Sequence, residues 1–131
     1  MFDLTGDERE RHSRQILLPE IGSCGQQLLK SARVLIVGAG GLGSPVLFYL
    51  AAAGVGQITV LDFDLVDRSN LQRQILFQDS ELGKSKASLA AARASALNPD
   101  ISVKALNKRL DAGNAMQLVA DHDLVVDASD N

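Results

Sequence analysis

Residues 34–43 have the sequence Val-Leu-Ile-Val-Gly-Ala-Gly-Gly-Leu-Gly, and this stretch decides the fold. Its first four residues are apolar, which is typical of a strand buried on both faces of a parallel sheet. The glycines that follow lack Cβ atoms, so the backbone can approach a phosphate closely. A helix is expected over 42–53, where apolar residues recur at helical spacing, with Pro45 in its first turn and Gly54 as its C-terminal cap. Free N–H groups at the start of this helix would form an anion site.

The spacing of Gly38, Gly40 and Gly43 is typical of a dinucleotide-binding loop. Asp62 ends the next apolar run and lies 24 residues after Gly38. Such a carboxylate is expected about 20 residues after the loop, where it bonds a ribose hydroxyl. An NAD-dependent oxidoreductase and an ATP-using enzyme both fit this pattern. The alternative without a ligand is that the glycines only permit tight packing of the strand against the helix.

A polar segment follows the second apolar run. Ser69 and Gln72 have the spacing of a capping box, which predicts a short helix near 69–75. Asn70 and Arg73 would then share one face and offer an amide and a guanidinium to one anion. The alternative is a solvated arginine beside a helix cap.

Two lysines are expected in the first turn of a helix over 83–97, namely Lys84 and Lys86. Cations at this end oppose the helix dipole, so a bound phosphate that offsets the repulsion is a hypothesis for at least one of them. Hydrated lysines are the alternative. A Walker loop is excluded, because it needs a glycine five residues before Gly83 and the chain has Gln78 there.

Residues 124–126, Leu-Val-Val, are a third candidate for a buried strand, and the segment from Asp127 to Asn131 begins the loop after it. Ligands of open parallel sheets bind at the edge where the strands end. Asp130 is therefore a candidate ligand of a magnesium ion that bridges phosphates. The alternative is an Asp-Asn turn without a ligand.

Composition is typical of a globular domain. With 131 residues the chain can bury one core, and its net charge of −3 argues against general affinity for nucleic acid. No apolar stretch approaches the roughly 20 residues of a membrane span, and residues 1–14 are too charged for a secretory signal. We therefore expect a cytoplasmic protein without a membrane partner. A single cysteine, Cys24, excludes an internal disulfide and a cysteine-rich zinc site in this chain, and we expect it to be structural or incidental.

Hydrophobic periodicity predicts an α/β fold, a Rossmann-like, doubly wound and mainly parallel sheet. Residues 1–31 are interpreted as an N-terminal helical extension and residues 32–131 as the nucleotide-binding domain. This domain is expected to be truncated at its C-terminal end, because a doubly wound sheet would ordinarily continue. The expected helices are 7–17, 26–31, 42–53, 69–75, 83–97 and 111–121, and the expected strands are 33–37, 57–62, 101–107 and 123–127.

Five ordered motifs give the chain a specific resemblance. They resemble the ubiquitin-activating-type adenylyltransferases, in particular the bacterial ThiF, MoeB and HesA branch, from about Arg11 to Asn131. Beside the glycine loop, the motifs are Arg-His-Ser-Arg-Gln-Ile at 11–16, Asp-Phe-Asp at 62–64, Ser-Asn-Leu-Gln-Arg-Gln at 69–74, Gly-Lys-Ser-Lys-Ala at 83–87 and Asp-Ala-Ser-Asp-Asn at 127–131.

The resemblance implies roles for individual residues. Asp62 would contact the ribose of ATP, Asp130 would handle magnesium, and Arg14 would reach the active site from the opposite subunit of a homodimer. The implied catalytic residues are Arg14, Arg73, Lys86 and Asp130. The implied nucleotide contacts are Gly38, Gly40, Gly41, Gly43, Asp62, Asp64, Ser69, Asn70, Leu71, Gln72, Arg73, Lys86, Asp130 and Asn131. The alternative for Arg14 is an ordinary charged helix face.

The implied reaction is magnesium- and ATP-dependent adenylylation of the C-terminal Gly-Gly carboxylate of a ubiquitin-like sulfur-carrier protein. Pyrophosphate would leave, and the pathway would be of the molybdopterin or thiamin type. Zinc would be expected only in a C-terminal part beyond Asn131. An NAD-dependent oxidoreductase stays open as an alternative, although it gives no reason for Asn70, Arg73 and Lys86 to converge. A non-catalytic nucleotide-binding fragment also stays open.

Overall fold

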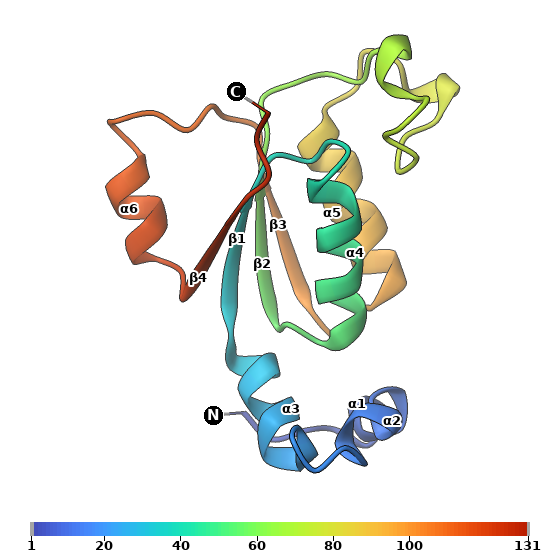
Figure 1. The fold of residues 1–131 in the computed structure, drawn as a ribbon, viewed down its shortest axis with the longest axis vertical. Coiled ribbons are helices and arrows are strands. Elements are labelled where there is room, and N and C mark those ends of the chain that lie inside the picture. Colours follow the sequence, from blue (N-terminus) through green and yellow to red (C-terminus); the bar gives the residue numbers. More distant parts are fainter. Residues whose placement is uncertain (1, 131) are drawn as a thin grey trace.

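The computed structural model of the protein describes residues 2–130 and contains one parallel sheet of four strands. The strands are β1 (Arg33–Val37), β2 (Gln57–Leu61), β3 (Ser102–Leu106) and β4 (Leu124–Asp127), in the order β3-β2-β1-β4. This order is that of a Rossmann-like sheet, so the predicted fold class is confirmed. Because every pair is parallel, all four strands end at one edge of the sheet, which lies at the top of Figure 1.

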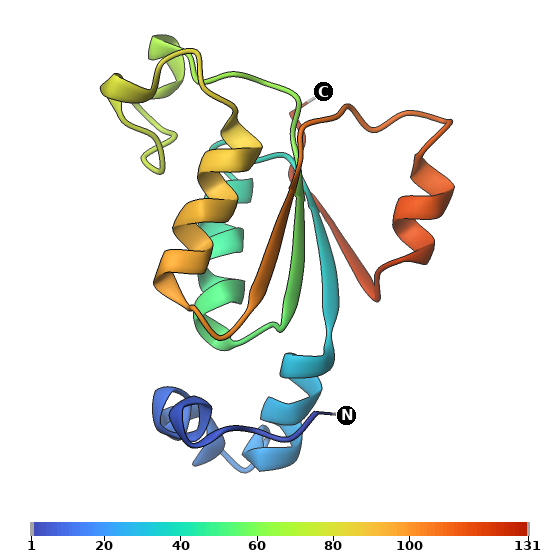
Figure 2. The same cartoon turned by 180° about the vertical axis from the view of Figure 1, so that it is seen from behind.

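Helices cover both faces of the sheet. On one face lie α4 (Gly43–Ala53) and α5 (Lys86–Leu97), and on the other lies the short α6 (Ala115–Ala120) (Figures 1 and 2). Side chains alternate along β1, so that Val34 and Ile36 belong to one core and Leu35 and Val37 to the other. This double burial explains why β1 is an uninterrupted apolar run, as predicted.

The last strand is less buried than its sequence suggests. Leu124 is 56% exposed and Val125 is 37% exposed, so the expectation of a buried strand over 124–126 is wrong. The physical reason is position, because β4 lies at the edge of the sheet and pairs only with β1 in the described part of the chain.

The N-terminal region is divided more finely than periodicity indicates. The single helix expected over 7–17 is two helices, α1 (Gly6–Arg11) and α2 (Ser13–Ile16), which His12 separates with φ −103° and ψ 15°. The helix expected over 26–31 begins earlier, as α3 (Gly22–Ser31). These helices lie at the opposite end of the molecule from the edge where the strands end (Figure 1).

Most other elements begin and end within a few residues of the expected positions. Gly54 ends α4 in the left-handed conformation, with φ 95°, as predicted. Between β2 and α5 the chain forms two short 3-10 helices, η1 (Arg68–Asn70) and η2 (Asp79–Glu81). None of the helices in residues 2–130 combines the length and apolar character that a membrane crossing requires.

Candidate functional site

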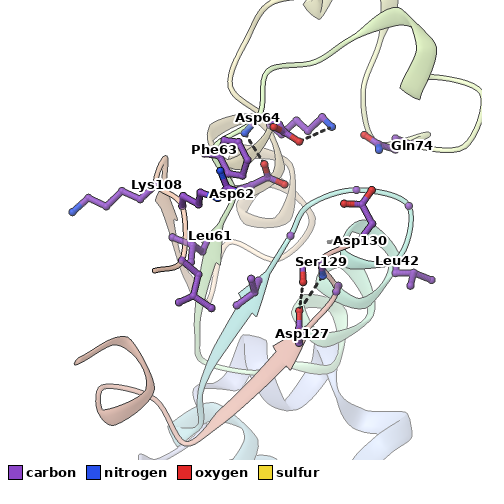
Figure 3. A pocket seen from close by; sticks show the side chains of 18 of the residues that line it. Leu42, Leu61, Asp62, Phe63, Asp64, Gln74, Lys108, Asp127, Ser129 and Asp130 are labelled. Atoms are coloured by element: carbon purple, nitrogen blue, oxygen red, sulfur yellow. Dashed lines mark hydrogen bonds and ion pairs between the residues drawn. The ribbon is translucent and has the colours of Figure 1, made fainter. Parts of the chain in front are cut away.

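A pocket of about 620 Å³ opens at the edge where the strands end. This volume lies within the range typical of small-molecule sites. The loops that follow all four strands contribute to it, together with the crossover between β2 and α5 (Figure 3). Its lining residues are Val37, Gly38, Gly40, Gly41, Leu42, Leu61, Asp62, Phe63, Asp64, Arg73, Gln74, Lys86, Lys108, Arg109, Leu110, Asp127, Ala128, Ser129 and Asp130.

The four glycines of the loop have two different roles, in backbone packing and in lining the pocket. A Cβ atom on Gly43 would lie 1.8 Å from the carbonyl oxygen of Gly38, and one on Gly38 would lie 2.9 Å from the carbonyl oxygen of Ala128. These two positions therefore need glycine for close packing of the backbone. Gly40 and Gly41 instead present their backbone to the pocket, where an anion can approach them. Gly43 is the one glycine of the loop that does not line the pocket.

Asp62 holds the glycine loop in place. Its Oδ2 accepts a hydrogen bond from the backbone N–H of Ala39 (2.8 Å), and its Oδ1 accepts one from the N–H of Asp64 (2.7 Å). The sequence placed Asp62 correctly at the end of β2 but did not indicate this bracing. Because a carboxylate can accept about four hydrogen bonds, lone pairs remain for a ligand.

The capping box expected at Ser69 and Gln72 is wrong. Asp67 caps the short helix instead, and its Oδ1 accepts hydrogen bonds from both the N–H (2.9 Å) and the hydroxyl (2.6 Å) of Ser69. These bonds hold the pKa of Asp67 below its usual range, so the carboxylate is ionised at neutral pH. The helix therefore starts at Arg68, and it is a single 3-10 turn that ends at Asn70.

Part of the polar segment lines the pocket and part does not. Arg73 and Gln74 are in the lining, and the Arg73 guanidinium donates a hydrogen bond to the carbonyl of Ser69 (3.3 Å). The carbonyl of Asn70 accepts the backbone N–H of Gln74 (2.8 Å), which fixes the turn. The lining does not include the remaining predicted contacts of this segment, namely Ser69, Asn70, Leu71 and Gln72.

The two lysines have different positions. Helix α5 begins at Lys86 and not at residue 83, because Ser85 accepts the N–H of Ser88 as the N-cap. Lys84 therefore precedes the helix, is exposed and lies outside the lining, so the prediction that it sits in the first turn is wrong. Lys86 is buried in the pocket wall, with its Nζ 3.8 Å from Oδ2 of Asp64.

The end of β4 and the loop after it bring two carboxylates to the pocket. Asp127 accepts the hydroxyl (2.5 Å) and N–H (3.1 Å) of Ser129, and these bonds lower the pKa of Asp127. Asp130 is exposed in the lining beside the glycine loop (Figure 3). Within residues 2–130 no three His, Cys, Asp or Glu residues are grouped to hold a metal. A single carboxylate still fits magnesium, which proteins commonly bind through one or two carboxylates and substrate phosphates.

Several lining residues were missed by the sequence analysis. Phe63 follows β2, and the guanidinium of Arg109 lies 5.0 Å from the centroid of its ring. Lys108 and Arg109 follow β3, so the rule that ligands bind where parallel strands end would have indicated them. Nothing in the sequence pattern indicates Gln74, which is uncharged and directly follows Arg73.

Arg14 is remote from this pocket in its own chain. It is exposed on α2, at the other end of the molecule from the glycine loop (Figure 1). Its chain therefore cannot bring it to the pocket without a large rearrangement. The predicted contact Asn131 lies outside the described residues.

Comparison with known proteins identifies the family. The ThiF family matches residues 12–131. The SAMP-activating enzyme E1 of Haloferax volcanii is 51% identical over 130 residues, which cover 99% of this chain and 48% of that protein. The sulfur carrier protein adenylyltransferase of Thermus thermophilus is 50% identical over 127 residues, which cover 97% of this chain and 47% of that protein.

A solved structure agrees with these sequence relatives. The tRNA N6-threonylcarbamoyladenosine dehydratase TcdA of E. coli, in complex with ATP, superposes with a TM-score of 0.91 and 30% identity. The match covers 99% of this chain and 53% of that one. The chain thus spans about half the length of the relatives that it matches. With nearly all its residues matched, the chain belongs to the ThiF family.

Proposed function

We propose that this chain is the nucleotide-binding part of an adenylyltransferase that activates the C-terminal Gly-Gly carboxylate of a ubiquitin-like sulfur-carrier protein. One observation carries the proposal. The ends of the parallel strands and the crossover after β2 bring the glycine loop, Arg73, Lys86 and Asp130 into one pocket. Relatives that include a sulfur carrier protein adenylyltransferase support the kind of reaction and partner.

The groups in the pocket suit this chemistry. The carrier's terminal carboxylate oxygen would attack the α-phosphorus of ATP, the bond from that phosphorus to the bridging oxygen would break, and pyrophosphate would leave. A carboxylate is already a nucleophile at neutral pH, so the site needs alignment and charge neutralisation but no strong base. Arg73 and Lys86 would bind phosphate oxygens, while Asp62 would keep the loop in place and contact the ribose. Magnesium, held by Asp130 and the phosphates, would neutralise charge on the departing pyrophosphate.

Further parts of the proposal concern the complete enzyme. It would be a cytoplasmic homodimer in which each pocket receives Arg14 from the other subunit. Its pathway would be of the molybdopterin or thiamin type. The remote position of Arg14 in its own chain supports the contribution in trans.

Titration calorimetry on this chain tests the nucleotide. We expect MgATP to bind more tightly than NAD, because the three phosphates of ATP carry more negative charge toward Arg73 and Lys86. The variant Arg73→Ala should lose about tenfold or more in MgATP affinity, as expected for a hydrogen bond to a charged group. The matched control is Arg68→Ala, since Arg68 is exposed, lies five residues away and pairs with Asp79 outside the pocket. Equal or tighter binding of NAD would contradict the adenylyltransferase proposal and favour an oxidoreductase.

A further inference from the structure

The segment 67–73 of the crossover runs between two anchored residues. Val66 before it is buried, and its N–H donates a hydrogen bond to the carbonyl of Lys84 (2.8 Å). Gln74 after it is buried in the pocket wall. Most residues between these two are exposed, and of the segment only Arg73 lines the pocket. The placement of Arg73 therefore depends on how this short segment is held.

A chain of hydrogen bonds leads from Asp67 to Arg73. Oδ1 of Asp67 accepts both the N–H (2.9 Å) and the hydroxyl (2.6 Å) of Ser69. The carbonyl of Ser69 in turn accepts a bond from the Arg73 guanidinium (3.3 Å), and the carbonyl of Asn70 accepts the backbone N–H of Arg73 (3.2 Å). A guanidinium has five N–H donors, so the bond to Ser69 sets its direction and leaves other donors for a ligand.

The turn that Asp67 caps is short and exposed. It is the 3-10 helix η1, which has three residues, and both Arg68 and Ser69 are exposed. The hydrogen bonds of a 3-10 helix have poorer geometry than those of an α-helix, and a single turn gains little from its own bonds. The bonds from Ser69 to the ionised Asp67 are charge-assisted and therefore stronger than neutral ones. Without them, fewer molecules would have the turn formed, and the apparent affinity for a ligand falls with the fraction of competent molecules.

We propose that Asp67 is a positioning residue, which holds the turn at Ser69 so that the guanidinium of Arg73 faces a bound nucleotide. The inference rests on the proposed function, because it assumes that Arg73 binds a phosphate. Asp67 lies outside the pocket lining, so it would act through Arg73 and not on the ligand itself. The proposal also gives Ser69 a role that needs no direct contact with the nucleotide, since its hydroxyl and carbonyl join Asp67 to Arg73.

The sign of the expected effect separates positioning from simple electrostatics. Loss of a negative charge near the phosphates would by itself strengthen the binding of an anionic nucleotide. Positioning predicts the opposite for Asp67→Ala, because alanine removes the hydrogen-bond acceptor. Asp67→Asn also removes the charge, but it keeps an oxygen that caps a helix about as well as aspartate does. We expect Asp67→Ala to bind MgATP about three- to tenfold more weakly than the native chain, and Asp67→Asn to bind it at least as tightly.

Titration calorimetry with MgATP measures both variants, alone and combined with Arg73→Ala. If Asp67 acts through Arg73, Asp67→Ala should lose no further affinity once Arg73 is replaced. A residue that only stabilises the fold would lower the affinity by the same factor in both backgrounds. The matched control is Asp79→Ala, which removes an exposed carboxylate of the same crossover that pairs with Arg68 outside the pocket. This control should bind MgATP within about twofold of the native chain.

Four results of this experiment would contradict the positioning role. They are native or tighter affinity in Asp67→Ala, an equal loss in Asp67→Asn, an equal loss in the Arg73→Ala background, and native affinity in Arg73→Ala itself. Circular dichroism verifies that each variant is folded. Ser69→Ala, which removes the hydroxyl bonded to Asp67, should give a smaller loss in the same cycle, and it keeps the test open if Asp67→Ala does not fold.

Failure of the proposed function gives a different result. If the native chain prefers NAD to MgATP, the proposed function fails, and the same cycle with NAD decides the role of Asp67, because NAD also carries phosphates. If MgATP is preferred but Asp67→Ala binds it normally, the proposed function stands and the inference fails. If the native chain binds neither nucleotide, both fail.

Discussion

At the scale of single residues, Asp62 both holds the glycine loop in place and lines the pocket. Its two oxygens each accept a hydrogen bond from a backbone N–H, one from Ala39 in the glycine loop and one from Asp64.

In Asp62→Asn one of these acceptors becomes an NH₂ group, which cannot accept a hydrogen bond. We expect the loop to loosen and the affinities for MgATP and for inorganic tripolyphosphate to fall together by about five- to tenfold. Calorimetry with both ligands measures this, with the exposed Asp79→Asn as the charge-matched control. A residue that only contacts ribose would leave tripolyphosphate binding unchanged, and that result would contradict the bracing role.

The sequence was most informative about residues whose backbone conformation or position in the fold only one residue type satisfies. Gly38 and Gly54 adopt positive φ, which side chains other than glycine rarely tolerate, so the pattern alone identified them. Gln74 could not be identified in this way, because its place in the pocket wall depends on the path of the crossover between β2 and α5. Spacing indicates where a strand ends, whereas the neighbours of a side chain depend on tertiary contacts.

At the scale of elements, α4 is held at both ends. At its start the Ser44 hydroxyl donates to the carbonyl of Ala39 in the glycine loop (2.9 Å). At its end the carbonyl of Ala53 accepts bonds from the amides of Gln15 (3.1 Å) and Gln26 (2.9 Å), which belong to α2 and α3. The N-terminal helices are therefore attached to the helix that begins at the glycine loop.

Replacing the buried Gln26 tests this attachment. Gln26→Leu removes its bond to Ala53 and its acceptance of the Gln15 amide (3.0 Å). We expect the free energy of unfolding to fall by about 1–3 kcal/mol, because buried partners are left unsatisfied. Urea denaturation measures the change. The neighbouring Gln27→Leu removes only an exposed bond to Asp3 and should stay within about 0.5 kcal/mol of the native chain. An equal effect of the two substitutions would show that the attachment contributes nothing.

The boundaries of the helices show that hydrophobic periodicity alone does not predict where a helix begins. The start of α5 moves from residue 83 to Lys86 because Ser85 caps it. The helix expected near 69–75 starts earlier, at Arg68, because Asp67 and not Ser69 is its N-cap. Several short polar side chains in one segment can each cap a helix, and the sequence does not rank them. Long apolar runs such as β1 have no such competitor, and their limits were predicted correctly.

At the scale of the whole molecule, Arg14 and Asp130 lie toward opposite ends of the chain's fold (Figure 1). A closed homodimer in which both residues act would contain two composite sites, each built from two subunits.

In a complete enzyme that contains this chain, we expect Arg14→Ala and Asp130→Ala each to abolish carrier-dependent exchange of pyrophosphate into ATP. Mixing the two under conditions that exchange subunits should restore about a quarter of the native sites, since half the dimers are mixed and each mixed dimer has one intact site.

The control for this experiment is Arg9→Ala, which removes a nearby exposed charge of the N-terminal helices and should retain activity. Mixed dimers that form but stay inactive would show that Arg14 does not act in trans. Full activity of Arg14→Ala alone would show that it is only a surface charge.

The strand order has a consequence for the order in which the sheet can assemble. The pairing of β1 with β2 joins nearby segments, as in Arg33 with Gln57. The pairing of β1 with β4 joins Val34 to Leu124, which lies 90 residues later. The conformational entropy lost on closing a loop grows with its length, and contacts between distant segments slow folding. During synthesis, β4 becomes available only after β1, β2 and β3 have been made. Until then β1, the most apolar strand, keeps one edge unpaired, and such an edge favours association between chains.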